Sequence, residues 1–368
     1  MYCFDYRSCI EPLLPYVPGR PIDDVKREYE LDCVVKIASN ENPNGCSKLA
    51  KEAVIKSLES AMIYPDGNCT FLRNSLASHF NVSTKSLVFG AGADEIISML
   101  GKIFINEGDE CITASVTFSQ YASSVISMGG NMVYADMKDD AYDLNGILGK
   151  ITNKTKLIFI ANPNNPTGTI FTENEQRDFI SKVHANVIVV FDEAYSEFVT
   201  RSDFPKTLDY LSEYKNAVLM KTFSKIYGLA SLRVGYAIAH PDVISLFEKI
   251  RCPFNVASQA QAAAVAALAD VDFTKKSYLE NIESRDFVCA ELDKLGVSYI
   301  PTQANFVMLK IPETAVTTSS KEMFVELMKR GYIVRAGKPL GMEGYLRITF
   351  GKINDMRGFI DVFKELIK

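Results

Sequence analysis

The chain of 368 residues is 47% hydrophobic and 23% charged, with a formal net charge of −5 at pH 7. This composition is that of an ordinary globular protein, long enough for one large core or for two domains. The negative charge argues against a basic surface for nucleic acid, and no apolar run approaches the length of a membrane span. We therefore expect neither nucleic acid nor membrane as a partner.

The cysteines and the first residues of the chain indicate the cellular compartment in which we expect the protein. Eight cysteines are scattered without a C-x-x-C pair, and only three histidines accompany them. This pattern fits a reducing compartment better than a disulfide framework, and it makes a metal site unexpected. Asp5, Arg7 and Glu11 are unlike the start of a signal peptide, so we expect a cytoplasmic protein with no bound metal.

Prolines are concentrated near the N-terminus, in the stretch LLPYVPGRPIDDV at residues 13–25. Proline lacks the backbone N–H that the interior of a helix requires. We therefore predict that residues 1–30 form an extended N-terminal arm.

Short apolar runs alternate with stretches of helical spacing from residue 86 onward. Several runs are apolar throughout, which is typical of strands buried on both faces of a mostly parallel sheet. We predict an α/β fold, with a large domain over residues 31–252 whose central sheet is flanked by helices. The predicted strands and helices lie within residues 86–92, 93–104, 110–115, 118–128, 131–136, 156–163, 173–183, 186–195 and 216–224.

The character of the sequence changes after Arg251. An alanine-rich helix at residues 257–270 leads into a long charged helix at residues 275–296. Predicted strands and two more helices follow, so we expect a smaller α+β domain over residues 253–368, joined by part of the N-terminal segment.

The stretch GAGADE, Gly90 to Glu95, lies between a predicted strand and a predicted helix. Glycine permits a close backbone approach, and the N-terminus of a helix offers free N–H groups to an anion. This arrangement suits a phosphate group. The alternative interpretation is a tight turn with Asp94 near the helix cap.

A second loop, ANPNNPTG at residues 161–168, follows an apolar strand. Asparagine and proline at this density indicate a rigid loop at the carboxyl end of the strand, where ligands bind in open α/β sheets. Loop structure alone explains Pro166 and Gly168 but does not obviously require three asparagines, which favours a binding role.

Asp192 ends the most apolar predicted strand. A carboxylate in such a place is costly unless it meets a cation or a protonated ring nitrogen. The alternative role is that of a helix cap.

Ser224 and Lys225 follow the next predicted strand, and Arg233 comes shortly afterwards. A lysine beside strand ends that carry asparagine and aspartate suits a Schiff-base amine, and the arginine suits a phosphate. An exposed surface lysine is the common alternative, but four such motifs at strand ends outweigh it.

Together these motifs resemble the fold-type I aminotransferases that use pyridoxal 5′-phosphate, and most of all the histidinol-phosphate aminotransferase family. The resemblance spans nearly the whole chain. Its matching stretches are LLPYVPGRPI, KIASNENPNG, YPDGNCTFLRNSLA, FGAGADEII, TFSQY, ANPNNPTG, FDEAY, TFSKIYGLASLRVGY and YLRITFG.

The resemblance implies roles for residues around the cofactor ring. Lys225 would carry the cofactor as a Schiff base, and Asp192 would pair with the pyridinium nitrogen. Asn165 and Tyr195 would bind the ring hydroxyl, and Phe118 would stack on the ring.

It also implies a phosphate site shared between two subunits. The backbone N–H groups of Ala93 and Asp94, with Ser224 and Arg233, would hold the cofactor phosphate. Tyr64 would reach the same phosphate from the neighbouring subunit, which makes the expected protein a homodimer.

The substrate site rests on the same resemblance. Arg347 would bind the carboxylate of glutamate, Arg335 would add a second cation, and Tyr16 of the partner's arm and Asn40 would complete the pocket. Two arginines suit a phosphate dianion, although an ion pair inside the small domain is the alternative. The implied reaction moves an amino group between L-histidinol phosphate and 2-oxoglutarate.

Three other functions stay open at this point. An aminotransferase for aromatic amino acids and a decarboxylase of threonine phosphate occur on similar sequences. A regulator that binds pyridoxal phosphate without turnover is a different class, but it would need an additional DNA-binding domain, for which the chain has neither spare length nor a basic region.

Overall fold

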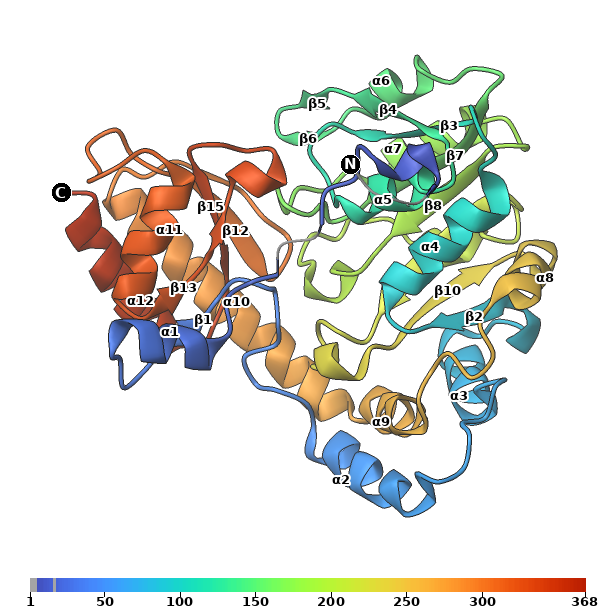
Figure 1. Ribbon diagram of the computed structural model, residues 1–368, viewed down its shortest axis with the longest axis horizontal. Coiled ribbons are helices and arrows are strands. Elements are labelled where there is room, and N and C mark those ends of the chain that lie inside the picture. Colours follow the sequence, from blue (N-terminus) through green and yellow to red (C-terminus); the bar gives the residue numbers. More distant parts are fainter. Residues whose placement is uncertain (1–4, 16–17) are drawn as a thin grey trace.

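The structure is a computed structural model that describes residues 5–15 and 18–368. Figure 1 shows a larger body around one central sheet and a smaller body around a second sheet. The long helix α10 (Val271–Lys294) runs from one to the other. Among the described residues, no helix is long and apolar enough to cross a membrane.

The larger body contains a seven-stranded sheet in the order β2-β10-β9-β8-β7-β3-β4. Four neighbouring pairs are parallel, and β10 is antiparallel to both of its neighbours, so the predicted mostly parallel sheet is confirmed. The strands are β2 (Leu87–Gly90), β3 (Glu110–Ala114), β4 (Asn131–Ala135), β7 (Thr155–Ala161), β8 (Ile188–Asp192), β9 (Ala217–Thr222) and β10 (Gly235–Ala239).

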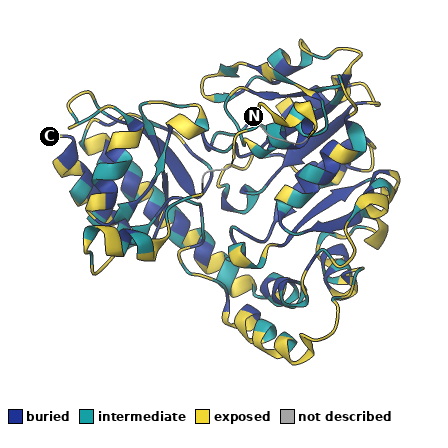
Figure 2. Ribbon diagram, viewed as in Figure 1, coloured by how far each residue is buried: buried dark blue, intermediate teal, exposed yellow. Residues whose placement is uncertain are grey.

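Helices cover both faces of this sheet, which explains why its strands are apolar throughout. One face packs against α4 (Ala93–Phe104), α5 (Gln120–Ile126) and α8 (Pro241–Ile250). The other packs against α3 (Thr70–Phe80), α6 (Leu144–Leu148), α7 (Glu173–Lys182) and α9 (Ser258–Ala269). Every residue of β8, β9 and β10 is buried, as the dark strands at the centre of the larger body in Figure 2 show.

The smaller body contains a four-stranded antiparallel sheet of β11 (Tyr299–Ile300), β12 (Phe306–Lys310), β15 (Tyr345–Thr349) and β14 (Arg335–Ala336). Its core is closed by α10, α11 (Ser320–Lys329) and α12 (Ile353–Leu366). Near the N-terminus, β1 (Val35–Lys36) pairs in parallel with β13 (Tyr332–Ile333) and so joins this body. Further elements are α2 (Lys48–Ser57) and the hairpin of β5 (Met137–Lys138) and β6 (Ala141–Tyr142).

The N-terminal segment differs from the prediction. Residues 22–29, expected in an extended arm, form helix α1 (Ile22–Tyr29) after Pro21. Proline is tolerated at the start of a helix, and two aspartates in the first turn favour the positive end of the helix dipole. Val25 is buried against Met328 and Ile333 of the smaller body. The predicted domain boundaries at residues 30 and 252 remain a proposal.

Candidate active site

Several predicted site residues lie at the carboxyl ends of β7, β8 and β9. These strands are parallel neighbours, so the loops that follow them meet at one edge of the sheet. Lys225 lies three residues after the end of β9 and is partly buried. Its Nζ donates to the carbonyl oxygen of Ser39 at 3.2 Å and lies 5.4 Å from the centre of the Tyr195 ring.

Asp192 is the last residue of β8 and is only 7% exposed. Tyr121 donates its hydroxyl to Oδ2 at 2.6 Å, and the backbone N–H of Ala194 donates to Oδ1 at 3.1 Å. The pKa of Asp192 is raised to about 6, chiefly by burial and to a smaller extent by the nearby charge of Asp94. The two hydrogen bonds and Lys225 act in the opposite direction. Both hydrogen bonds come from neutral donors, so the anion suits a cationic ligand.

The predicted phosphate site is a close junction between the start of α4 and Arg233. Nη2 of Arg233 lies 3.0 Å from Oδ2 of Asp94, beside the first turn of α4 at Ala93. A Cβ on Gly92, whose φ is +81°, would lie 2.3 Å from Nη2 of Arg233. A Cβ on Gly235 would lie 2.6 Å from the backbone nitrogen of Ala93. Glycine is therefore required at both positions, and the junction brings free N–H groups and a guanidinium together.

Glu95 supports this turn, although the sequence did not reveal that role. Its Oε2 accepts from the backbone N–H of Ala91 at 2.5 Å and from Nδ2 of Asn255 at 2.8 Å. Asn255 also donates to the carbonyl oxygen of Phe89 at the end of β2. These contacts fix the turn before α4. Ser224, the remaining predicted phosphate ligand, is buried directly before Lys225.

The three asparagines of the loop at residues 161–168 have different roles. Asn162 donates to the carbonyl oxygen of Phe171, and Asn164 is fully buried and donates to the carbonyl oxygen of Val116. These two asparagines stabilise the loop, and the predicted binding role of the loop remains a proposal. Oδ1 of Asn165 accepts from Nη1 of Arg347 at 2.6 Å, which links the loop to the smaller body.

The predicted substrate arginines lie on neighbouring strands of the smaller sheet. Arg347 of β15 is 6% exposed, and its Nη2 donates to the carbonyl oxygen of Ala38 at 2.8 Å. Arg335 of β14 is its direct cross-strand partner, so the two side chains leave the same face of the sheet. The predicted Arg335–Arg347 pair is therefore brought together beside Asn165.

Asn40 is buried and has a φ of +57°. Its Nδ2 donates to the hydroxyl of Tyr195 at 3.0 Å, and its Oδ1 accepts from Thr349 at 2.9 Å. It thereby joins Tyr195 of the larger body to β15 of the smaller one. Its predicted contact with substrate remains a proposal.

Phe118, Tyr64 and Tyr16 are the remaining predicted residues. Phe118 is partly buried and packs edge-on against Tyr121, with ring centres 5.7 Å apart. Tyr64 is 79% exposed in the loop before α3, where it stacks on Phe254 at 4.9 Å. Tyr16 lies outside the described residues.

The fully buried lysine of this region is Lys221 rather than Lys225. Lys221 is 8% exposed within β9, and its Nζ lies 2.9 Å from Glu197 and 3.7 Å from Glu193. Burial raises the pKa of Glu193 to about 7, while Lys221 opposes this rise. The ion pairs with Glu193 and Glu197 account for the buried position of Lys221.

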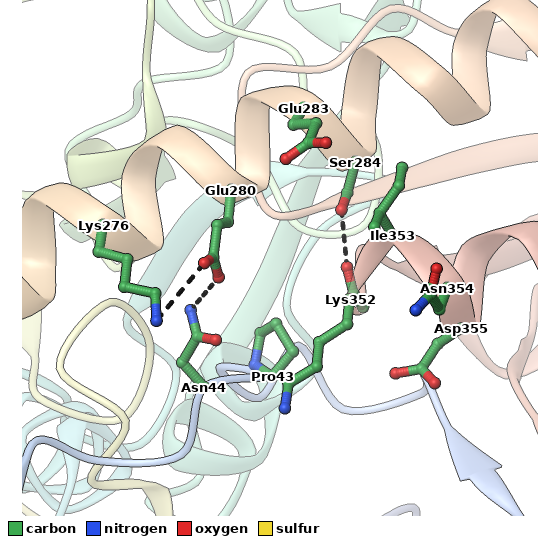
Figure 3. A pocket seen from close by; sticks show the side chains of 11 residues that line it. Pro43, Asn44, Lys276, Glu280, Glu283, Ser284, Lys352, Ile353, Asn354 and Asp355 are labelled. Atoms are coloured by element: carbon green, nitrogen blue, oxygen red, sulfur yellow. Dashed lines mark hydrogen bonds and ion pairs between the residues drawn. The ribbon is translucent and has the colours of Figure 1, made fainter.

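A separate cleft of about 490 Å³ lies between α10, the loop at Pro43 and Asn44, and the start of α12 (Figure 3). Glu280, one of its charged groups, accepts from Nδ2 of Asn44 at 2.7 Å and lies 3.7 Å from Nζ of Lys276. None of the predicted site residues lines it.

The chain was compared with known proteins. The model of the family "Aminotransferase class I and II" matches residues 32–363. A histidinol-phosphate aminotransferase from Caldicellulosiruptor saccharolyticus is 42% identical over 362 residues, covering 98% of this chain and 100% of the relative. The corresponding enzyme from Bacillus subtilis is 41% identical, covering 97% and 98%.

Solved structures show the same fold. Histidinol-phosphate aminotransferase from Sinorhizobium meliloti, determined in complex with pyridoxal-5′-phosphate, superposes with a TM-score of 0.89 at 26% identity. The alignment covers 98% of this chain and 97% of that one. Aspartate aminotransferase from Thermus thermophilus superposes with a TM-score of 0.83 at 19% identity, which confirms the aminotransferase fold alone. From the match over nearly its whole length, the chain belongs to the class I and II aminotransferases and, among them, to the histidinol-phosphate aminotransferase family.

Proposed function

We propose that the protein transfers an amino group between L-histidinol phosphate and 2-oxoglutarate in histidine biosynthesis, with pyridoxal 5′-phosphate bound at Lys225. The observation that carries this proposal is the convergence of Lys225, the buried Asp192 and the Arg233 junction at one edge of the sheet. The support from comparison is the 42% identity over the whole length of a histidinol-phosphate aminotransferase.

The residues at this edge fit the cofactor. The start of α4, with Arg233 and Ser224, offers donors to a phosphate, and Asp192 offers a buried anion to a protonated ring nitrogen. Asn165 and Tyr195 supply polar groups for the ring hydroxyl. When bound, pyridoxal phosphate supplies an aldehyde that condenses with amines and a ring that withdraws electrons from the carbon bearing the amine.

Lys225 has two tasks in this proposal. Its Nζ must be uncharged to attack a carbonyl carbon, and afterwards, as a free amine, it removes the proton from Cα of the amino donor. The carbonyl oxygen of Ser39 and the ring of Tyr195 hold Nζ in place. Asp192 keeps the proton on the ring nitrogen throughout, because its carboxylate is buried and oriented.

Arg347 and Arg335 determine the substrate class in this proposal. Their guanidinium groups lie on one face of the smaller sheet and match the geometry of a phosphate or carboxylate. A phosphorylated donor presents two negative charges to them, whereas an aromatic amino acid presents one carboxylate and a neutral ring. The same arginines would receive the carboxylates of 2-oxoglutarate.

We also propose that the active protein is a cytoplasmic homodimer. Tyr64 is highly exposed, and so are several large apolar side chains close to it in the sequence: Ile55, Leu58, Met62, Ile63 and Phe71. An exposed apolar surface of this kind favours association with a second copy. Mixing inactive Lys225→Ala protein with an inactive Tyr64 variant should restore some activity, because a hybrid dimer contains one intact site. If hybrid dimers form and stay inactive, Tyr64 does not serve the partner's site.

A panel of amino donors tests the substrate. With 2-oxoglutarate as acceptor, kcat/KM for histidinol phosphate should exceed that for phenylalanine by roughly tenfold to a hundredfold, the effect of one charge-assisted contact. Equal or faster turnover of phenylalanine or tyrosine would instead identify an aromatic aminotransferase. Release of carbon dioxide from threonine phosphate without amino transfer would identify a decarboxylase.

A further inference from the structure

The side chain of Tyr121 is held rigidly against Asp192. Its hydroxyl donates to Oδ2 of Asp192 at 2.6 Å, and the residue is 0% exposed. Its ring stacks on Phe159 of β7, with centres 4.5 Å apart and planes 2° apart, while Phe118 packs against its edge. The position of the hydroxyl is therefore fixed by aromatic packing on two sides.

The two donors to Asp192 act on different oxygens. Tyr121 binds Oδ2, and the backbone N–H of Ala194 binds Oδ1. One donor on each oxygen fixes the rotation of the carboxylate, so its remaining lone pairs point in a defined direction. A hydrogen bond from a neutral hydroxyl also favours the ionised form, against the opposing effect of burial.

We propose that Tyr121 is a positioning residue for the cofactor: its hydroxyl holds Asp192 as an oriented anion that receives the protonated ring nitrogen of pyridoxal phosphate. Tyr121 follows Phe118 by three residues, so one short segment connects the residue that would stack on the ring with the carboxylate that would hold its nitrogen. This inference rests on the proposed function, because it takes pyridoxal phosphate as the cofactor.

The test compares two ligands on cofactor-free protein by equilibrium dialysis. One is pyridoxal phosphate, and the other is its 1-deaza analogue, in which a carbon atom replaces the ring nitrogen. Tyr121→Phe should bind pyridoxal phosphate roughly tenfold to a hundredfold more weakly than the unmodified protein, the effect of a hydrogen bond to a charged group. Binding of the deaza analogue should change little, because it has no nitrogen for Asp192 to hold.

Tyr142→Phe is the matched control. Its buried hydroxyl contacts Thr117 at 2.6 Å and Thr113 at 3.3 Å, so the change removes a buried tyrosine hydroxyl that is not bonded to Asp192. We expect its effect on the two ligands to be equal. For Tyr121→Phe, an equal loss for both ligands, or no loss for either, would overturn the inference and show a structural role.

Two further outcomes are informative. An unmodified protein that binds neither ligand would reject the proposed cofactor and, with it, the role of Tyr121, whereas an equal loss in Tyr121→Phe overturns that role alone. If Tyr121→Phe does not fold, Phe159→Leu removes the ring stacked on Tyr121 and keeps the hydroxyl. That variant should show the same selective loss for pyridoxal phosphate, and an equal loss for both ligands would again overturn the inference.

Discussion

Replacing Asp192 with asparagine should stabilise the cofactor-free protein while abolishing transamination. Burial raises the pKa of Asp192 from 3.8 to about 6. The pKa of Asp192 is higher in the folded protein than in the unfolded chain, so protonation of this carboxylate stabilises the fold. This stabilisation is complete below about pH 4 and is lost as pH rises through 6. At about 1.4 kcal/mol per pH unit, the ionised carboxylate costs about 3 kcal/mol above that range. Asparagine keeps the shape and removes this cost.

Denaturant unfolding of both cofactor-free proteins at two pH values measures the effect. The gain in the free energy of unfolding from Asp192→Asn should rise from about 1.6 kcal/mol at pH 5 to about 3 kcal/mol at pH 8. Asp94→Asn is the matched control, since it removes an exposed carboxylate of the same site and should give a much smaller gain. A destabilising effect of Asp192→Asn at pH 8, or a gain that does not depend on pH, would refute the reasoning.

Three other substitutions probe the phosphate and substrate sites. Gly92→Ala should weaken the binding of pyridoxal phosphate by more than about tenfold in equilibrium dialysis. The added Cβ would displace Arg233, and alanine is strained at the positive φ of this residue. Unchanged affinity would show that the junction of Gly92 and Arg233 does not bind the phosphate. In steady-state assays, Arg335→Ala should lower kcat/KM for histidinol phosphate more than for phenylalanine, by roughly tenfold or more. Arg347→Ala should lower kcat/KM for the amino donor and for 2-oxoglutarate alike. A loss for only one of these two substrates would show that Arg347 does not bind both.

Sequence patterns predicted those parts of the fold that depend on local hydrophobicity. The fully apolar runs at β7, β8 and β9 predicted a sheet covered on both faces, and their polar ends predicted the edge where the site lies. Strand β10 was not predicted. Its residues, Gly235–Ala239, directly follow Arg233, and that stretch was interpreted as part of the phosphate site rather than as a strand. Helix α1 was not predicted, because closely spaced prolines favour an extended chain, although proline is also tolerated at the start of a helix.

The interactions between distant segments were beyond sequence reasoning. Tyr121 lies in the matched stretch at residues 117–121, and its spacing from Phe118 is a weak signal, but its bond to Asp192 joins residues 71 positions apart. Lys221 and Lys225 are only four residues apart, but Lys221 lies in β9, where every residue is buried, and pairs with Glu193 and Glu197 of another segment. The network from Asn40 to Tyr195 and Thr349 likewise depends on how the two bodies pack.

The central claim is that Lys225 is the amine that binds the cofactor. Protein loaded with pyridoxal phosphate is reduced with borohydride, digested, and its peptides are mapped by mass spectrometry. The account predicts that the stable pyridoxyl label lies on Lys225, whose Nζ the structure places beside Tyr195 and the carbonyl oxygen of Ser39. Lys225→Ala should fold and take up no label. A label on Lys221 or on any other lysine would contradict the account.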